Sequence, residues 1–192
     1  MRDINLVWKG KREMKAQLRS LTTQAAFTQA HGEGFEEDKT SNLLVEGQNL
    51  DFLIAHREQY EGKVALIYID PPYNTGNDFV YEDDFAQSAD EYLENSGQFD
   101  EDGNRLVQNT ESNGRFHTDW LNMMYPRLKL AKDLLSDDGV IFISIDDNEV
   151  DNLNKICKEI FGESNFVAQF TWKRRTGSND ALKNVSIDHE YI

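Results

Sequence analysis

Two short runs of apolar residues, far apart in the chain, dominate its hydrophobic pattern. The first covers residues 64–69 and the second, interrupted by one serine, covers 140–145. Both are rich in β-branched residues and follow a glycine closely, which is typical of strands buried on both faces of a parallel sheet. We therefore predict two central strands at these positions.

Apolar residues around the second run follow helical spacing. A helix is expected after Asp119, its predicted N-cap, and Pro126 is expected to kink this helix or divide it in two. Another helix is expected to begin at Asp147 or Asn148. Gly162 should end it, because glycine is favoured just beyond a helix C-terminus.

The remaining elements follow from weaker patterns. Residues 11–30 lack glycine and proline and are rich in helix formers, so they predict a helix. Residues 42–46 and 166–172 predict short strands, and residues 50–60 predict a helix. Strands that alternate with helices indicate an α/β fold, in which helices cover a parallel or mixed sheet.

At 192 residues the chain is expected to form one domain with a substantial core. We divide it into a helical extension, residues 1–40, and a main domain, residues 41–192, that contains an acidic loop at 82–118. Nine acidic and no basic residues lie between Glu82 and Asp102. A solvated loop is the simpler interpretation, and a mobile flap beside a site is the alternative.

Composition excludes several classes of function. The formal charge of −15 argues against a broad nucleic-acid surface on this chain alone. Cys157 is the sole cysteine and the four histidines have no metal-ligand spacing, so no metal is expected. There is no signal-peptide pattern and no apolar run of membrane-spanning length, which favours a cytoplasmic location without a membrane partner.

The strongest candidate site is the tetrapeptide that closes the first apolar run, Asp70-Pro71-Pro72-Tyr73. The prolines restrict the backbone and donate no hydrogen bond, so a carboxylate, a carbonyl and a ring are held in fixed order. In open α/β sheets, ligands bind at the carboxyl ends of strands. Asp70 and the Pro71 carbonyl suit the amino group of a planar base, and Tyr73 suits stacking on its ring. A strand exit without chemistry is the alternative.

Two further groups are weaker candidates. Asp146 and Asp147 follow the second strand and reach the same sheet edge, although helix capping explains them more simply. The basic run that includes Lys173 and Arg174 suits phosphate contacts, and a solvated turn is equally consistent with it.

Beyond the tetrapeptide, several motifs carry a specific resemblance. Residues 70–85 (DPPYNTGNDFVYEDDF) resemble the catalytic loop of DNA adenine-N6 methyltransferases, above all the modification subunit of type III restriction-modification systems. The similarity covers about residues 41–192. It continues through 120–128 (WLNMMYPRL), 134–149 (LLSDDGVIFISIDDNE), 160–166 (IFGESNF) and 189–192 (HEYI).

This resemblance implies a Rossmann-like fold, S-adenosylmethionine as methyl donor and adenine in double-stranded DNA as acceptor. By position, Asp70, Pro71 and Tyr73 would hold the amino group and ring of an adenine flipped out of the duplex, with Pro72 shaping the corner. A cytosine-N4 enzyme more often has serine in place of this aspartate. The implied donor contacts are Asp70, Pro72 and Asn49, and the implied substrate contacts are Tyr73, Asn74, Thr75, Lys173 and Arg174.

The chain departs from the family pattern in two places. Gly47-Gln48-Asn49 stands where Gly-Asp-Asn is common, and the Phe-x-Gly-x-Gly donor loop has no counterpart, since Gly32-Glu33-Gly34 follows a polar segment. We therefore expect an incomplete fold without the strand that carries the glycine loop, so that strand 64–69 has an unpaired edge.

The expected protein is thus the N-terminal part of an adenine methyltransferase, inactive alone and completed by a C-terminal part. The resemblance implies a homodimer and a restriction subunit as partners of the whole enzyme. One alternative is a non-catalytic truncated remnant or interaction protein. Another is a methyltransferase that acts on cytosine N4 or a different amino group.

Overall fold

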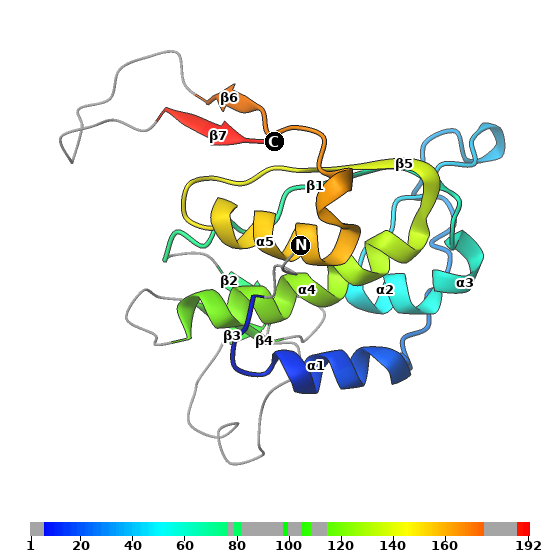
Figure 1. Ribbon diagram of the computed structural model, residues 1–192. Coiled ribbons are helices and arrows are strands. Elements are labelled where there is room, and N and C mark those ends of the chain that lie inside the picture. Colours follow the sequence, from blue (N-terminus) through cyan, green and yellow to red (C-terminus); the bar gives the residue numbers. More distant parts are fainter. Residues whose placement is uncertain (1–5, 77–78, 82–97, 100–104, 109–114, 175–187) are drawn as a thin grey trace.

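Two parallel strands form the centre of the molecule. The computed structural model describes residues 6–76, 79–81, 98–99, 105–108, 115–174 and 188–192. Strand β1 (Val64–Ile69) pairs in parallel with β5 (Leu135–Ile143), and helix α4 (Phe116–Leu134) connects them, as Figure 1 shows. The predicted first strand is confirmed to the residue, and so is the α/β arrangement.

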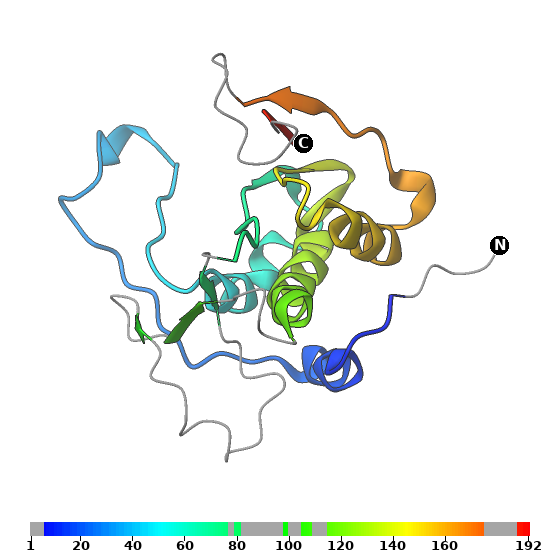
Figure 2. The same ribbon diagram turned by 90° about the vertical axis from the view of Figure 1, so that its left-hand side faces the viewer.

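Helices cover one face of this pair. Helices α2 (Asn49–Ala55), α4 and α5 (Val150–Phe161) lie together on one side of β1 and β5 in Figure 2. Helix α4 contacts α5, α2, the short α3 (Arg57–Tyr60) and α1 (Lys11–Gln17). The core is centred on α4, whose buried Trp120, Met123 and Leu128 join Ile156 of α5.

The opposite face of β1 is open. Leu66 and Tyr68, which point away from the helices, are 57% and 56% exposed, whereas Ile69 packs against the core. Within the described residues, β5 is the one strand that pairs with β1. Strand β1 therefore has apolar side chains on both faces, but the core covers only one of these faces.

Two small antiparallel groups complete the fold. Strands β2 (Phe79–Tyr81), β4 (Arg105–Gln108) and β3 (Gln98–Phe99) pair in that order; β3 and β4 lie inside the predicted acidic loop, and β2 lies just before it. Strand β6 (Thr171–Lys173) pairs with β7 (His189–Tyr191). Tyr191 also bridges to Ile145, which brings β7 beside the carboxyl end of β5. The remaining short helices are η1 (Leu18–Ser20), η2 (Glu37–Lys39) and η4 (Glu163–Asn165).

The N-terminal predictions were partly wrong. The expected helix over 11–30 ends near residue 20, because the Thr23 hydroxyl binds both the Asp51 carboxylate (2.6 Å) and the Ala25 amide (3.0 Å). These bonds compete with helical hydrogen bonds. Residues 42–46 form no strand, and Leu44 is fully exposed. Helix α1 nevertheless joins the core through Met14.

The predicted helix starts also differ. Helix α4 begins at Phe116, so Asp119 is not its N-cap and lies in the first turn, paired with Arg115 (3.1 Å). Pro126 does not divide this helix. The N-cap of α5 is Glu149 rather than Asp147 or Asn148. As predicted, α5 ends before Gly162, which has a positive φ of 97°.

The strand boundaries differ from prediction as well. Strand β5 begins at Leu135, before the predicted start at residue 140, and its register against β1 shifts between Val64 and Leu66. A Cβ at Gly139 would stand 2.8 Å from the Val64 carbonyl oxygen, so this close approach requires glycine. Strand β6 is shorter than the predicted 166–172.

Much of the acidic loop, residues 82–97, 100–104 and 109–114, lies outside the described residues. No helix of the described part is long and apolar enough to cross a bilayer.

Candidate active site

Five elements meet at one edge of the central pair. The carboxyl ends of β1 and β5, the N-termini of α4 and α5, and strand β7 all lie toward the left of Figure 1. The tetrapeptide Asp70–Tyr73 leaves β1 at this edge. We call these four residues the corner. Sequence reasoning placed the corner at a strand's carboxyl end, and the structure confirms that position.

The first and last residues of the corner carry its chemistry. Asp70 has an exposed side chain, and Tyr73 is half-buried with its hydroxyl 3.3 Å from Oε2 of Glu190 on β7. Burial raises the pKa of Tyr73, and the nearby carboxylates of Asp70 and Glu190 raise it further. The phenol therefore stays neutral at physiological pH, with its hydroxyl held by carboxylates.

The two proline carbonyls have different surroundings. The Pro72 carbonyl accepts a 2.7 Å hydrogen bond from Nε1 of Trp120 in the first turns of α4. No donor from the described residues is bonded to the Pro71 carbonyl. Because Trp120 is fully buried, its indole fixes the corner against the core.

Asn74, which directly follows the corner, connects it to the N-terminal ends of α4 and α5. Its side chain is fully buried and its amide donates to Oε1 of Glu149, also fully buried, and to the Phe116 carbonyl (3.4 Å). The predicted substrate contact by this amide does not fit such a placement. Thr75, the next predicted contact, is exposed.

Asp146 and Asp147 are engaged locally. Asp146 accepts hydrogen bonds from the backbone and side chain of Asn148, and burial raises its pKa despite these bonds. Asp147 accepts a 2.7 Å bond from the hydroxyl of Tyr191. Neither carboxylate caps α5, whose N-cap is Glu149, so the predicted capping role is wrong. Asp146 instead closes a turn with Asn148, and Asp147 connects this segment to β7.

Of the remaining predicted site residues, Arg174 lies near the corner, whereas Asn49 is engaged elsewhere. Oδ1 of Asn49 accepts a 2.8 Å bond from Nε of Arg127, in the middle of α4. Lys173 is exposed. Arg174 lies 3.8 Å from Oε2 of Glu190, and so reaches Tyr73 through that carboxylate.

Sequence reasoning missed three supporting residues: Trp120, Glu149 and Glu190. Each belongs to a motif that carried the resemblance, at 120–128, 134–149 and 189–192 respectively. Nothing local to these motifs shows that they meet the corner. No set of three or more potential metal ligands is clustered in the described part of the chain.

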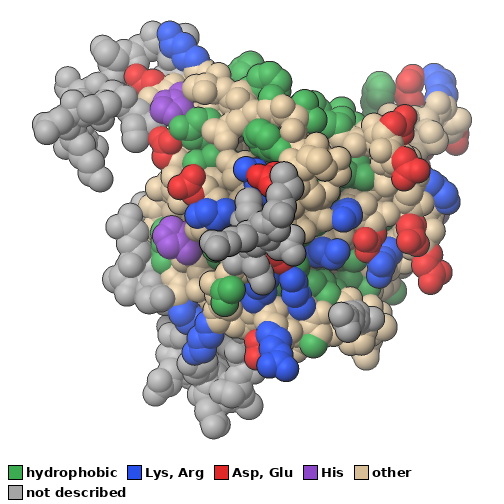
Figure 3. Space-filling model, viewed as in Figure 1, with side chains coloured by type: hydrophobic (Ala, Val, Ile, Leu, Met, Phe, Trp, Pro, Cys, Tyr) green, Lys and Arg blue, Asp and Glu red, His purple; other side chains and the backbone are tan. Residues whose placement is uncertain are grey.

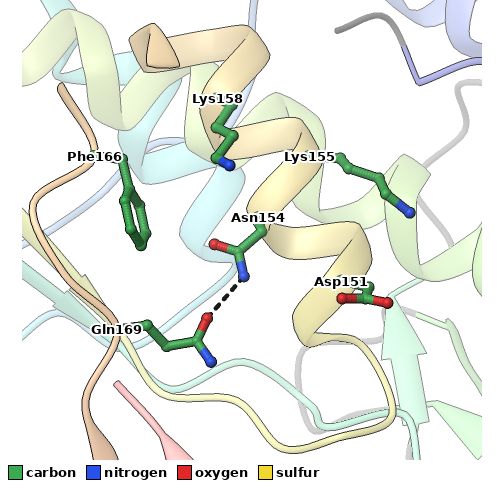
Figure 4. Close-up of a pocket in the computed structure, with 6 residues that line it drawn as sticks. All are labelled: Asp151, Asn154, Lys155, Lys158, Phe166 and Gln169. Atoms are coloured by element: carbon green, nitrogen blue, oxygen red, sulfur yellow. Dashed lines mark hydrogen bonds between the residues drawn. The ribbon is translucent and has the colours of Figure 1, made fainter. Parts of the chain in front are cut away.

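The rest of the surface is organised differently. An open pocket lies between the outer side of α5 and residues 166–169, where Asn154 donates to Gln169 (2.9 Å) and Lys158 lies near Phe166, as Figure 4 shows. None of the corner residues lines it. Lys and Arg side chains gather over α1, α4 and α5 in Figure 3, so this face is basic although the chain is acidic overall.

Comparison with known proteins places most of the chain in one family. Residues 64–192, which begin with β1, match the family model described as DNA methylase. The chain belongs to this DNA methylase family.

Three relatives are modification (Mod) subunits of type III restriction-modification enzymes. The chain is 41% identical over 171 residues to the EcoP15I Mod subunit of Escherichia coli and 42% identical over 171 residues to the EcoPI Mod subunit of Escherichia phage P1. Each match covers 88% of this chain and 26% of the relative. The StyLTI Mod subunit of Salmonella typhimurium is 46% identical over 160 residues, which cover 82% of this chain and 24% of that protein. The chain thus spans about a quarter of the length of these relatives.

Proposed function

We propose that this DNA methylase chain is the acceptor-binding part of a type III modification subunit that methylates N6 of adenine in double-stranded DNA. The observation that carries the proposal is the corner. An exposed carboxylate, a carbonyl to which no described residue donates, and an anchored tyrosine follow one another at the carboxyl end of a central parallel strand.

The corner suits an exocyclic amino group. Asp70 and the Pro71 carbonyl each accept one hydrogen bond from the two hydrogens of the adenine N6 amino group. The bond from Trp120 to the Pro72 carbonyl supports the Pro71 carbonyl as the acceptor. The Tyr73 ring stacks on the base, with its hydroxyl tethered to Glu190. An adenine that is flipped out of the duplex can reach these groups.

Catalysis by these residues is mainly orientation. Two acceptors in fixed positions hold the amino hydrogens and aim the nitrogen lone pair at the methyl donor. The carboxylate of Asp70 need not be a strong base, because the amino group becomes acidic once it is methylated. The proton then leaves N6 for Asp70 or for water.

The methyl donor is proposed to be S-adenosylmethionine, which supplies an electrophilic methyl group when bound. The residues present fit one side of such a ligand, because the exposed Asp70 carboxylate suits a sulfonium cation and the rigid Pro72 forms a wall. Asn49 fits less well, because Arg127 occupies its side-chain oxygen. We assign the donor contacts of this chain to Asp70 and Pro72.

A C-terminal part of the protein is proposed to complete the fold. The open edge and open face of β1 would accept a further strand, which carries the glycine-rich donor loop, and the structure that covers it. The chain alone is then inactive. A second modification subunit and a restriction subunit are the proposed partners of the whole protein. The names of its relatives, which are subunits of restriction-modification enzymes, support the second of these.

The decisive experiment replaces Asp70 in the whole protein that contains this chain. Asp70→Ala should lower the methylation rate about 100-fold or more, because one of two groups that orient the acceptor is removed. Nucleosides from methylated DNA are separated and identified by mass spectrometry. Asp138→Ala is the matched control, since that carboxylate lies in β5 near its opposite end and accepts from Ser136.

The outcomes separate the alternatives. N6-methyladenine that disappears with Asp70→Ala but not Asp138→Ala supports the proposal. N4-methylcytosine as the product would change the acceptor. Normal methylation by Asp70→Ala would refute the role of the corner, and no methylation by the wild-type protein would favour a non-catalytic interaction protein.

A further inference from the structure

A buried carboxylate connects the corner to helix α5. Glu149, the N-cap residue of α5, is fully buried, and each of its oxygens has partners. Oε1 meets the amide of Asn74 and Nδ1 of His117 (2.6 Å), and Oε2 accepts from the amide of Asn152 (2.8 Å). A buried charge is costly unless it is hydrogen-bonded in this way, so the arrangement is specific.

Asn74 is the residue through which Glu149 reaches the corner. It directly follows Tyr73, and its φ of 61° places it in the left-handed region, which most residues avoid. Asparagine tolerates this conformation better than most residues, and its short amide can hydrogen-bond from it. The bond to Glu149 therefore fixes both the side chain and the backbone direction of the loop just after the ring.

The corner is thus held at two successive points. Trp120 of α4 binds the Pro72 carbonyl, and Glu149 of α5 binds Asn74, so that Tyr73 lies between the two anchors. The anchors lie 48 and 75 positions away from their partners along the chain. The position of the ring relative to Asp70 is consequently set by tertiary structure rather than by the tetrapeptide alone.

We propose that Glu149 is a positioning residue for methyl transfer, acting through Asn74 to hold the Asp70–Tyr73 corner in its productive geometry. This inference rests on the proposed function of the corner. Glu149 touches no reacting atom in this role. A carboxylate suits this position because one of its oxygens contacts both the Asn74 amide and Nδ1 of His117, and a charged acceptor binds two donors well.

Two substitutions test the contact, and their combination restores it. Asn74→Asp retains the shape and the tolerance for a positive φ but places two carboxylates against each other. Glu149→Gln retains the shape and removes the charge. Together they rebuild one hydrogen bond in the reverse direction, because the glutamine amide donates to the new aspartate. Asn152→Ala is the control, since it removes a partner of Glu149 that is directed away from the corner.

In the whole protein, Asn74→Asp should lower kcat about tenfold or more, while KM for DNA stays within about twofold, because misplaced reacting groups lose rate rather than affinity. The double variant should recover kcat relative to Asn74→Asp alone, and Asn152→Ala should leave kcat nearly unchanged. A double variant whose kcat is the product of the single losses would overturn the proposal, because it would show no coupling.

A second readout is independent of methylation. Amide hydrogen exchange in peptides that cover residues 73–76 should accelerate in Asn74→Asp and slow again in the double variant. Unchanged exchange in Asn74→Asp overturns the proposal, even if the wild-type protein transfers no methyl group. If Asp70→Ala is inactive but the Asn74 and Glu149 variants keep the wild-type kcat, the positioning role fails and the proposed function stands.

Discussion

The two faces of strand β1 have contrasting surroundings, although their side chains are similar. Ile69 lies against a core built on α4 and α5, while Leu66 and Tyr68 on the other face are more than half exposed. Hydrophobic burial stabilises a strand in proportion to the area removed from water, so one face supplies most of the stabilisation found here. The covered face also holds both anchors of the corner.

This difference separates two properties of the DNA methylase chain. The acceptor side of the proposed site is assembled from described residues and belongs to the covered face. The open face of β1 carries Leu66 and Tyr68, whereas the solvent-facing side of a sheet is usually polar. Large side chains of this kind on both faces are typical of a strand that is covered on both sides. We expect changes on the covered face to affect folding strongly, and changes on the open face to depend on the rest of the protein.

The largest expected effect is at Trp120. Trp120→Ala should destabilise the whole protein by about 4 kcal/mol, because it opens a cavity in the core and leaves the Pro72 carbonyl without its donor. Chemical denaturation measures this loss. Trp172→Ala, at a tryptophan of β6 that is 58% exposed, is the matched control and should cost about 0.5 kcal/mol or less. Equal losses at the two sites would contradict the described core.

Particular segments show which elements of the fold could be predicted from the sequence. Strand β1 was predicted to the residue because its six apolar residues end at a proline pair, which is a local signal. The helix over 11–30 was overestimated because Thr23 is captured by Asp51, 28 positions away. Residues 42–46 are apolar enough for a strand, but the described chain offers them no strand to pair with.

The site shows the same limit. Asp70 to Tyr73 carry their chemistry in four adjacent residues, so the sequence alone located the corner. Glu149 was not predicted as a site residue, because its partner Asn74 is 75 positions away and nothing near either residue indicates the contact. Local signals therefore locate the reactive groups, whereas only the fold identifies the residues that support them.

An intermediate effect tests the open face by chemical labelling. In residues 1–192 alone, the thiol of Leu66→Cys should react readily, because the native side chain is 57% exposed. In the whole protein its reaction should be slower by about a hundredfold if the proposed C-terminal part covers it. The rate of thiol modification by an alkylating reagent is the measurement.

The native Cys157 is an internal control for this labelling. Burial raises the pKa of its thiol to about 12, so it should react roughly a thousandfold slower than an ordinary cysteine. Rapid reaction of Cys157 would reveal that the isolated chain has lost its fold. An unpaired apolar strand edge favours such a loss, because it can pair with other chains. Equal Leu66→Cys rates in the isolated chain and the whole protein, with Cys157 protected in both, would rule out the covering role.

The smallest expected effect is an acid-sensitive contact between the N-terminal segment and the covered face. Glu159 of α5 accepts hydrogen bonds from Lys11 (2.6 Å) and Lys15 (2.7 Å) of α1. Burial alone would raise its pKa, but the two lysines outweigh this and lower the pKa below the ordinary value. The contact is thus stabilising above the ordinary glutamate pKa and is lost as the pH falls through the lowered value.

Glu159→Gln should therefore lower the stability by about 1 kcal/mol at neutral pH, since Lys11 is buried but Lys15 is partly solvated. The difference in melting temperature between wild type and variant should shrink as the pH falls below the ordinary glutamate pKa and through the lowered pKa of Glu159, because the wild-type carboxylate then takes up its proton. Thermal unfolding across this pH range measures it. A difference that persists unchanged in acid would mean that Glu159 contributes through packing, and that α1 is held to the covered face by Met14 and its apolar neighbours.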